Sequence, residues 1–280
     1  MYGGFDAAPA LMSQRIVNPL QIGIGLWRQR YLLGQLIKRD VLLRYRGAMF
    51  GVLWIFLSPL LMLGIFAFVF GEIFRARWAL QNGGPPFWLM LYCGLIVFNL
   101  FADTVTRAPT TVRSHPSYVK KIIFPLEILP LVPLGASMVH GGFNFLIFAA
   151  ALLALGHASA GLLLFPLLVL PTLLLGMGVA WFLAAWGVFI KDMAQIVPLF
   201  VQMLLFLSPV FYPASAVPTA LRPLYRLNPL AVVIEASRAA TLGQPVSWLG
   251  WSAALLLGLL AAWAGYAYFQ NARDEFADVM

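Results

Sequence analysis

The sequence predicts an all-α membrane protein with six transmembrane helices. Of its 280 residues, 62% are hydrophobic and only 10% are charged, whereas a soluble domain averages about 25% charged residues. Asp, Glu, Lys and Arg are absent from five stretches: residues 47–71, 78–102, 128–190, 193–221 and 239–272. Because a transmembrane helix needs roughly 20 apolar residues, four of these stretches hold one helix each and the longest holds two.

The basic residues predict how these helices are oriented. With the N-terminus inside, 13 of the 18 Lys and Arg residues fall on the cytoplasmic side. The five on the outside are Arg75, Arg77, Arg222, Arg226 and Arg238. This asymmetry places both termini in the cytoplasm. The net charge of +8 is then a consequence of topology, and we expect no nucleic-acid partner.

The N-terminal region is predicted to lie outside the spans. Residues 1–25 are expected to form a tail, and residues 26–48 carry too many charges to cross a membrane. Asp40 and Arg44, at i,i+4 spacing, are expected to neutralise each other. The apolar residues here share one helical face, which predicts an amphipathic helix in the membrane interface; the alternative is a basic flank of the first span. This face comprises Leu26, Leu33, Leu36, Ile37 and Val41.

The six spans are expected near residues 50–71, 87–106, 128–155, 162–190, 194–207 and 248–269, in a transmembrane domain of residues 49–270 before a cytoplasmic tail of residues 271–280. Asp103 and Arg107 close the second span at the inner surface. The inner loop 107–127 has three prolines and room for one short helix.

Residues 208–243 contain five prolines and cannot form one helix. Two short helices that re-enter the outer leaflet are expected there, because irregular backbone at membrane depth needs protein or water partners.

Several kinds of chemistry are not indicated. No G-x-x-x-x-G-K-[ST] phosphate loop occurs, so ATP-driven work requires a partner subunit. His115, His140 and His157 are scattered along the chain and Cys93 is the only cysteine, so no metal site, disulfide or catalytic group is expected. The third and fourth predicted spans lack charges, which argues against an ion-coupled carrier.

Three segments, in order, resemble one family. They are RDVLLRYRGAMFGVLWIFLSPLLMLGIFAFVFGEIF at residues 39–74, SHPSYVKKIIFPLEILPL at residues 114–131, and the stretch from SPVFYPASAVP to LNPLAVVIEASRAATLG at residues 208–243. Together they resemble the permease subunits of type-2 ABC exporters of O-antigen and teichoic-acid polysaccharides.

The resemblance implies the partners. Two copies of the chain would surround a pore in the bacterial inner membrane, among membrane lipids. Two ABC ATPase subunits would bind ATP and Mg, and this chain itself would bind no cofactor. A lipid-linked polysaccharide would pass outward from the cytoplasm.

The resemblance also implies two functional segments. Part of the inner loop would be the coupling helix that contacts the ATPase, with an ordinary positive-inside loop as the alternative. Its residues are Ser114, Pro116, Ser117, Tyr118, Val119, Lys120 and Lys121. The outer segment would be a gate, with a structural re-entrant hairpin as the alternative. Its residues are Pro209, Tyr212, Pro213, Arg222, Arg226, Asn228, Pro229, Glu235 and Arg238, of which Glu235 and Arg238 are expected to pair near the outer surface.

Aromatic side chains are candidates for a pore lining, because sugars stack on aromatic faces. These candidates are Trp54, Tyr92, Phe98, Phe101, Trp181, Trp186 and Phe206. Aromatic residues in spans also pack against protein or lipid, which is the alternative. Small residues in the fourth span are expected to allow close helix packing: Gly176, Gly178, Ala180, Ala184, Ala185 and Gly187.

Two other functions remain open from the sequence. An exporter of a drug or another small amphiphile would share the six-span plan. A polytopic enzyme acting on polyprenyl-linked sugars would need clustered acids or histidines near the membrane surface. Asp103 and Glu127 lie near the inner face, but no D-x-D-like pair accompanies them.

Overall fold

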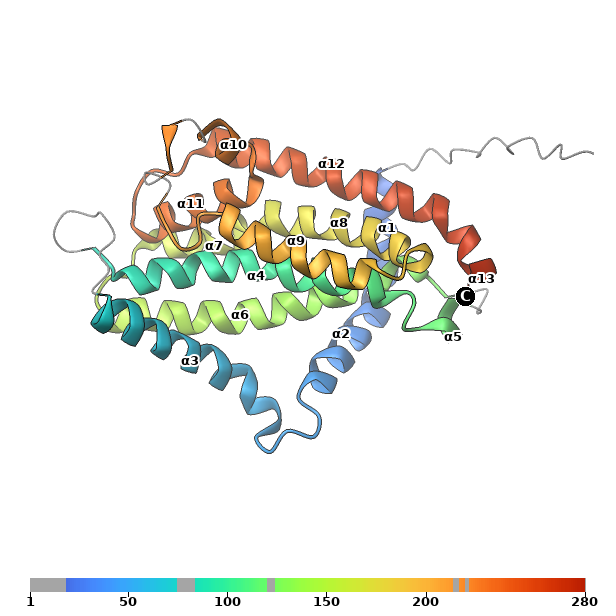
Figure 1. The fold of residues 1–280 in the computed structure, drawn as a ribbon, viewed down its shortest axis with the longest axis horizontal. Coiled ribbons are helices and arrows are strands. Elements are labelled where there is room, and N and C mark those ends of the chain that lie inside the picture. The colour runs from blue at the N-terminus through green and yellow to red at the C-terminus, as the bar shows by residue number, and fades with distance from the viewer. Residues whose placement is uncertain (1–18, 75–83, 120–123, 214–216, 220–221, 280) are drawn as a thin grey trace, which may run out of the picture.

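A computed structural model describes residues 19–74, 84–119, 124–213, 217–219 and 222–279. The regular structure of these residues is helical, without a strand. Long helices lie side by side in a bundle, and α3 leans away from it (Figure 1). The α-helices are α1 Pro19–Arg28, α2 Arg30–Arg44, α3 Trp54–Phe66, α4 Phe87–Thr111, α5 Pro116–Val119, α6 Leu131–Ala154, α7 Phe165–Leu168, α8 Leu170–Phe189, α9 Met193–Leu207, α10 Arg222–Leu227, α11 Pro229–Thr241, α12 Trp248–Ala272 and α13 Phe276–Val279.

Five helical stretches among the described residues are long and apolar enough to cross a membrane. They are Gly51–Ile73, Phe87–Thr111, Leu126–Ala154, Ala160–Phe189 and Trp248–Glu275. Five of the six predicted spans are thus present, and the second continues to Thr111 rather than ending near residue 106. The remaining predicted span corresponds to α9, which has only 15 residues. It ends at Leu207 because Pro209 disfavours the helical conformation at the residue before it, and Ser208 is extended.

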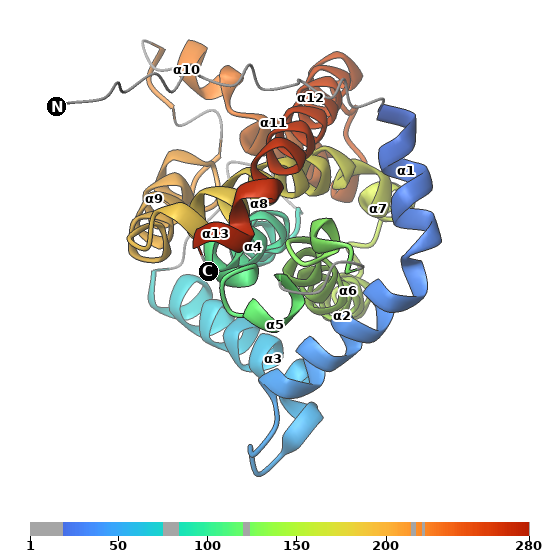
Figure 2. The same ribbon diagram turned by 90° about the vertical axis from the view of Figure 1, so that its right-hand side faces the viewer.

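The α4 helix forms the centre of the bundle. It packs against α6, α8, α9 and α11, and these helices surround it when the bundle is viewed along its length (Figure 2). Its buried side chains include Leu89, Met90 and Val97. Thr104 and Ser137 place their hydroxyl oxygens 3.1 Å apart between α4 and α6. This helix is therefore the element to which functional segments at both ends attach.

The small residues predicted for close packing in the fourth span are all buried in α8. A methyl group on Gly178 would lie 2.2 Å from the carbonyl carbon of Ala261 in α12. A methyl group on Gly187 would lie 1.9 Å from the carbonyl oxygen of Pro109 in α4. The backbones of α8 and its neighbours thus approach too closely for any side chain, which confirms the prediction of close packing.

The predicted amphipathic helix begins earlier and ends earlier than expected. Instead of one helix over residues 26–48, α1 begins at Pro19 and α2 ends at Arg44. The chain then turns through Gly47, whose φ of 87° favours glycine. The predicted apolar face is packed against the protein: Ile37 and Val41 contact Ile55 and Ala136. The face was predicted correctly, and its described contacts are with the ends of the spans.

The first span is the most exposed. Only 11% of the apolar window in Gly51–Ile73 is buried within the chain. Large apolar side chains such as Leu60 and Ile65 are exposed along α3. An apolar surface of this extent is covered by lipid or by another protein surface.

Candidate functional site

The inner loop contains one short helix, as predicted. The α5 helix spans Pro116–Val119 and lies at the same end of the bundle as α13 (Figure 1). Pro116 and Ser117 are exposed, as is Ser114. Tyr118 and Val119 are half-buried and pack on an apolar cluster that contains Phe276. The other two predicted coupling residues, Lys120 and Lys121, lie outside the described residues.

Stacked rings hold α5 in position. The Tyr118 ring stacks on His115 at a centroid distance of 5.4 Å and on Phe124 at 4.3 Å. Arg39 of α2 donates to the Tyr118 hydroxyl at 3.5 Å. His115 Nδ1 lies 2.9 Å from the carbonyl oxygen of Thr111, the last residue of α4. A four-residue helix is not stable alone, so these contacts with α2 and α4 are what fix its position.

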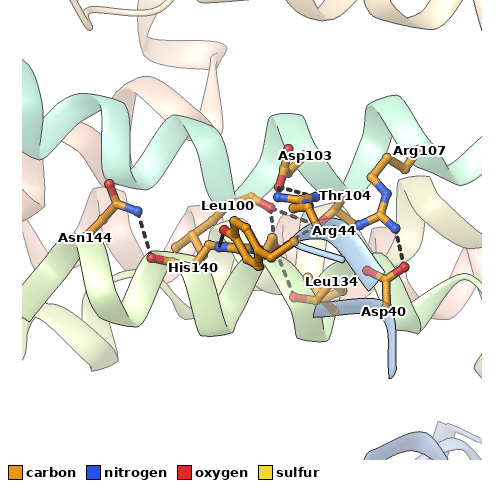
Figure 3. A network of polar contacts seen from close by, with 11 residues as sticks. Asp40, Arg44, Leu100, Asp103, Thr104, Arg107, Leu134, His140 and Asn144 are labelled. Carbon is orange, nitrogen blue, oxygen red and sulfur yellow. Dashed lines mark hydrogen bonds and ion pairs between the residues drawn. The ribbon is translucent and has the colours of Figure 1, made fainter. Parts of the chain in front are cut away.

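The charged residues near the C-terminal ends of α2 and α4 pair between helices, which corrects the predicted Asp40–Arg44 pair. Arg44 Nη1 and Nη2 each lie 3.1 Å from Asp103 Oδ2 (Figure 3). Arg107 Nη2 donates to Asp40 Oδ1 at 2.5 Å. The side chains of α2 reach α4 because α2 packs on α6, the neighbour of α4, and spacing within one helix cannot reveal that arrangement. The sequence held one signal of this pairing: the same i,i+4 acid–base spacing occurs in both helices, at Asp40 and Arg44 and at Asp103 and Arg107.

The segment of residues 208–243, predicted to lie on the outer side, is called the outer hairpin below. It begins where α9 ends. Ser208 is extended, and Asn228 links it to the next helix. The Asn228 side chain donates to Ser208 Oγ at 3.1 Å and accepts from the Leu230 backbone nitrogen at 3.0 Å. Asn228 is therefore the N-cap of α11, with Pro229 at the first helical position. Asn228 thus separates two short helices, α10 and α11.

Arg238 pairs with Glu235 as predicted, but it does not lie at the surface. Arg238 Nη1 is 3.0 Å from Glu235 Oε1, and the arginine side chain is only 2% exposed. Its guanidinium also donates to the Met90 carbonyl at 2.9 Å and the Val210 carbonyl at 2.7 Å, and to the Pro209 carbonyl. The sequence did not reveal this burial, because the acceptors are backbone carbonyls of α4 and of the turn after α9.

A glycine makes the site of Arg238 possible. A methyl group on Gly94 would lie 2.7 Å from Arg238 Nη2. The α4 backbone therefore leaves the space that the guanidinium occupies. Arg238 joins three segments: α11, the first turns of α4, and the chain that leaves α9.

Of the remaining predicted gate residues, Tyr212 lines a cavity at the end of the bundle where α11 lies. Tyr212 donates to the Phe206 carbonyl at 3.0 Å, and Arg222, which is exposed, donates through Nε to the Val217 carbonyl at 3.3 Å. Pro213 is half-buried. The side chain of Arg226 lies outside the described part. A cavity of about 500 Å³ between α9 and α10 is lined by residues that include Leu204, Phe206, Tyr212, Tyr225 and Asn228.

Tyr225 supplies a polar group to this cavity. Burial raises the pKa of Tyr225, and the negative charge of Glu235 raises it further. The hydroxyl therefore stays protonated and remains a hydrogen-bond donor. Among the described residues it has no hydrogen-bond partner.

Most of the aromatic candidates are buried within the chain rather than exposed to a pore. Tyr92, Phe98, Phe101 and Trp181 are at most 6% exposed. The Tyr92 hydroxyl donates to Asn144 Oδ1 at 2.8 Å, a contact between α4 and α6. In this conformation these four are packing residues, which corrects their assignment to a pore surface. A pore role stays a prediction for the half-buried Trp54 and Trp186 and the exposed Phe206.

The described residues offer little catalytic or metal-binding chemistry. No group of three His, Cys, Asp or Glu side chains among them is arranged to hold a metal ion. Cys93 is buried in α4. The groups that the structure brings together at both ends instead connect helices to one another.

Comparisons with known proteins agree over nearly the whole chain. A family described as ABC-2 type transporter matches residues 31–242. The chain is 28% identical over 266 residues to the O-antigen export system permease protein RfbA of Myxococcus xanthus, covering 90% of this chain and 96% of that protein. It is 22% identical over 255 residues to the O-antigen export system permease protein RfbA of Klebsiella pneumoniae, covering 89% and 95%. The region matched by the family includes α5, the outer hairpin and most of α2.

Proposed function

This chain belongs to the ABC-2 type transporter family, and from that premise we propose that it is the membrane-spanning permease subunit of an O-antigen-like polysaccharide exporter. The observation that carries the proposal is similarity to two O-antigen export permeases over at least 89% of the chain. The chain is a transporter subunit rather than an enzyme. Its substrate is a lipid-linked polysaccharide that moves outward from the cytoplasm.

The proposed topology has six crossings of the bacterial inner membrane. The sixth crossing is α9, which at about 1.5 Å per residue is roughly 22 Å long. Its support is the arrangement of the ends: α5 and the C-terminal α13 lie at one end of the bundle and α11 at the other (Figure 1). With both termini in the cytoplasm, α5 faces the cytoplasm and α10 and α11 re-enter the outer leaflet. The amphipathic α2 then lies at the inner interface.

We propose that two copies of the chain form the pore. Exposed apolar surface on α3 and α9 supports this arrangement, since Phe200, Met203 and Phe206 of α9 are 60–66% exposed. Two ABC ATPase subunits bind ATP and Mg and dock beneath α5. Movement of α5 is passed to the spans, and the outer hairpin, held by Arg238, closes the outer end between cycles.

The test is gene deletion followed by complementation. Cells without the gene are expected to lose polysaccharide from the surface and to accumulate the lipid-linked polymer inside, and the gene in trans is expected to restore export. Immunoblotting of surface and total polysaccharide measures both pools. Normal surface polysaccharide in the deletion strain would refute the proposal. Loss of resistance to small amphiphiles, with polysaccharide unchanged, would identify a drug exporter instead.

A further inference from the structure

The four charges at the inner end of the bundle specify one register between α2 and α4. Asp40 precedes Arg44 by four residues in α2, and Asp103 precedes Arg107 by four in α4. The acid of each helix contacts the base of the other (Figure 3). If α2 slid along its axis by four residues, about 6 Å, in one direction, Arg44 would meet Arg107. A slide of the same length in the other direction would bring Asp40 against Asp103. Opposite charges therefore meet in the observed register, and like charges meet one turn away.

Stability is not the main effect of these pairs. Their side chains keep 22–41% of their exposed area. Ion pairs of this exposure contribute about 0–1 kcal/mol each, because water screens them and ordering long side chains costs entropy. Charge pairs that add little stability are best known for specifying register. The four side chains of Asp40, Arg44, Asp103 and Arg107 are called the charge clamp below.

The charge clamp joins the coupling segment to the first span. Arg107 lies one turn before α4 ends at Thr111, and α5 begins at Pro116. On the other side, α2 leads into α3. Ile37 of α2 also packs so closely on Gly135 of α6 that a methyl group there would lie 2.1 Å from the isoleucine.

The Asp40–Arg107 pair has room to rearrange. A cleft of about 170 Å³ lies beside it, lined by residues of α2, the end of α4 and the start of α6. Within the described part of the chain, Asp40 Oδ2 and Arg107 Nη1 are buried without a hydrogen-bond partner. The pair therefore has both space and unused hydrogen-bonding atoms, which a rigid structural contact would lack.

We propose that the charge clamp keeps α2 in register with the inner end of α4, so that displacement of α5 moves α2 and the first span together. The four residues are thus positioning residues for export. This inference rests on the proposed function, since α5 is displaced only if an ATPase docks there. It adds a defined route from α5 to the first span.

A charge-reversal series tests the clamp. The double variant Asp40→Arg with Arg44→Asp keeps the net charge and the opposite charges within α2, but it places like charges against α4. Adding Asp103→Arg with Arg107→Asp makes both contacts between helices opposite again. Polysaccharide exported and ATP hydrolysed are measured for the permease–ATPase complex, and the melting temperature for the purified permease.

The double variant is expected to assemble and hydrolyse ATP while export per ATP falls about tenfold, and the four-site variant is expected to recover to within about twofold. A four-site variant that exports no better than the double variant overturns the clamp, as does normal export by the double variant. If the double variant does not accumulate, Asp40→Asn replaces it. A several-fold fall in export per ATP is then expected, and an unchanged ratio contradicts the clamp.

Failure of the proposed function would give a different result. The wild-type gene would then not restore surface polysaccharide in the deletion strain. In that case the melting temperature still tests whether the contacts of the charge clamp form. It is expected to fall in the double variant and to return in the four-site variant, and a four-site variant that melts like the double variant refutes the contact.

Discussion

Arg238 of α11 is a charged residue buried in the interior of the bundle. Three backbone carbonyls and Glu235 accept its hydrogen bonds. Arginine suits this position because its planar guanidinium directs five N–H groups in fixed directions, whereas a lysine ammonium concentrates its donors at one point. One side chain thus connects the hairpin to α4 and to the end of α9.

Replacing Arg238 should lower both the stability of the protein and its export activity. Arg238→Met removes a donor that Glu235 and three backbone carbonyls share, and removing one partner from buried hydrogen bonds costs about 1–3 kcal/mol. We expect a lower melting temperature and at least tenfold lower export, with partial recovery in Arg238→Lys. The control is Gln244→Ala, just beyond α11 and exposed, which should export normally. Normal export by Arg238→Met would contradict this role.

Gly94 tests the same site through the backbone. Gly94→Ala places a methyl group 2.7 Å from the guanidinium, and crowding of this kind costs about 1–3 kcal/mol. Gly142→Ala is the matched control, because nothing lies within 4 Å of its added methyl group. Thermal unfolding of the two purified variants should show a lower melting temperature only for Gly94→Ala. Equal melting temperatures would mean that the guanidinium moves away at little cost.

At the scale of single elements, α5 depends on neighbours for its position. Its four residues begin at Pro116, and residues 112–115 separate them from the end of α4 at Thr111. The stack of His115, Tyr118 and Phe124 and the contact from Arg39 connect it to α4 and α2. A short element held this way can transmit a push without lengthening or unwinding a span.

Two substitutions at Tyr118 separate stacking from hydrogen bonding. Tyr118→Phe keeps both ring stacks and loses the hydroxyl that Arg39 contacts at a long 3.5 Å, so near-normal coupling is expected. Tyr118→Ala removes stacks worth about 0.5–1.5 kcal/mol each and should reduce the ATP hydrolysis that the permease stimulates in its ATPase. Stimulated hydrolysis by the purified complex is the measurement. The prediction fails if the alanine variant stimulates hydrolysis as well as the phenylalanine variant.

At the scale of the whole molecule, the two ends of the bundle differ in character. The α2, α5 and α13 helices lie toward one end, and α10 and α11 lie at the other (Figure 1). The charge clamp belongs to the first end, because Arg107 lies one turn before α4 ends, and Arg238 of α11 belongs to the second. Both ends attach to α4, the most buried span, whose apolar window is 72% buried. A displacement at either end therefore acts on the same central helix.

Thiol labelling can test the orientation of the whole molecule. The native Cys93 is buried, so little labelling of the unmodified protein by the maleimide is expected. Ser117→Cys in α5 and Gln244→Cys after α11 each place a thiol at an exposed position. With a membrane-impermeant maleimide, Gln244→Cys should label in intact spheroplasts and Ser117→Cys only after permeabilisation. Labelling of Ser117→Cys in intact spheroplasts would reverse the proposed topology.

The sequence by itself determined the helical class, five of the spans, the apolar face of α2 and the tight packing of α8. These features follow from local properties: hydrophobicity, helical periodicity, side-chain size, and the φ restriction and missing N–H of proline. The tertiary structure alone decided that Asp40 and Arg44 pair with α4, that Arg238 is buried, and that Tyr92 and Trp181 are packing residues. Each of these depends on which backbone lies opposite the side chain, and that is set only when the helices come together.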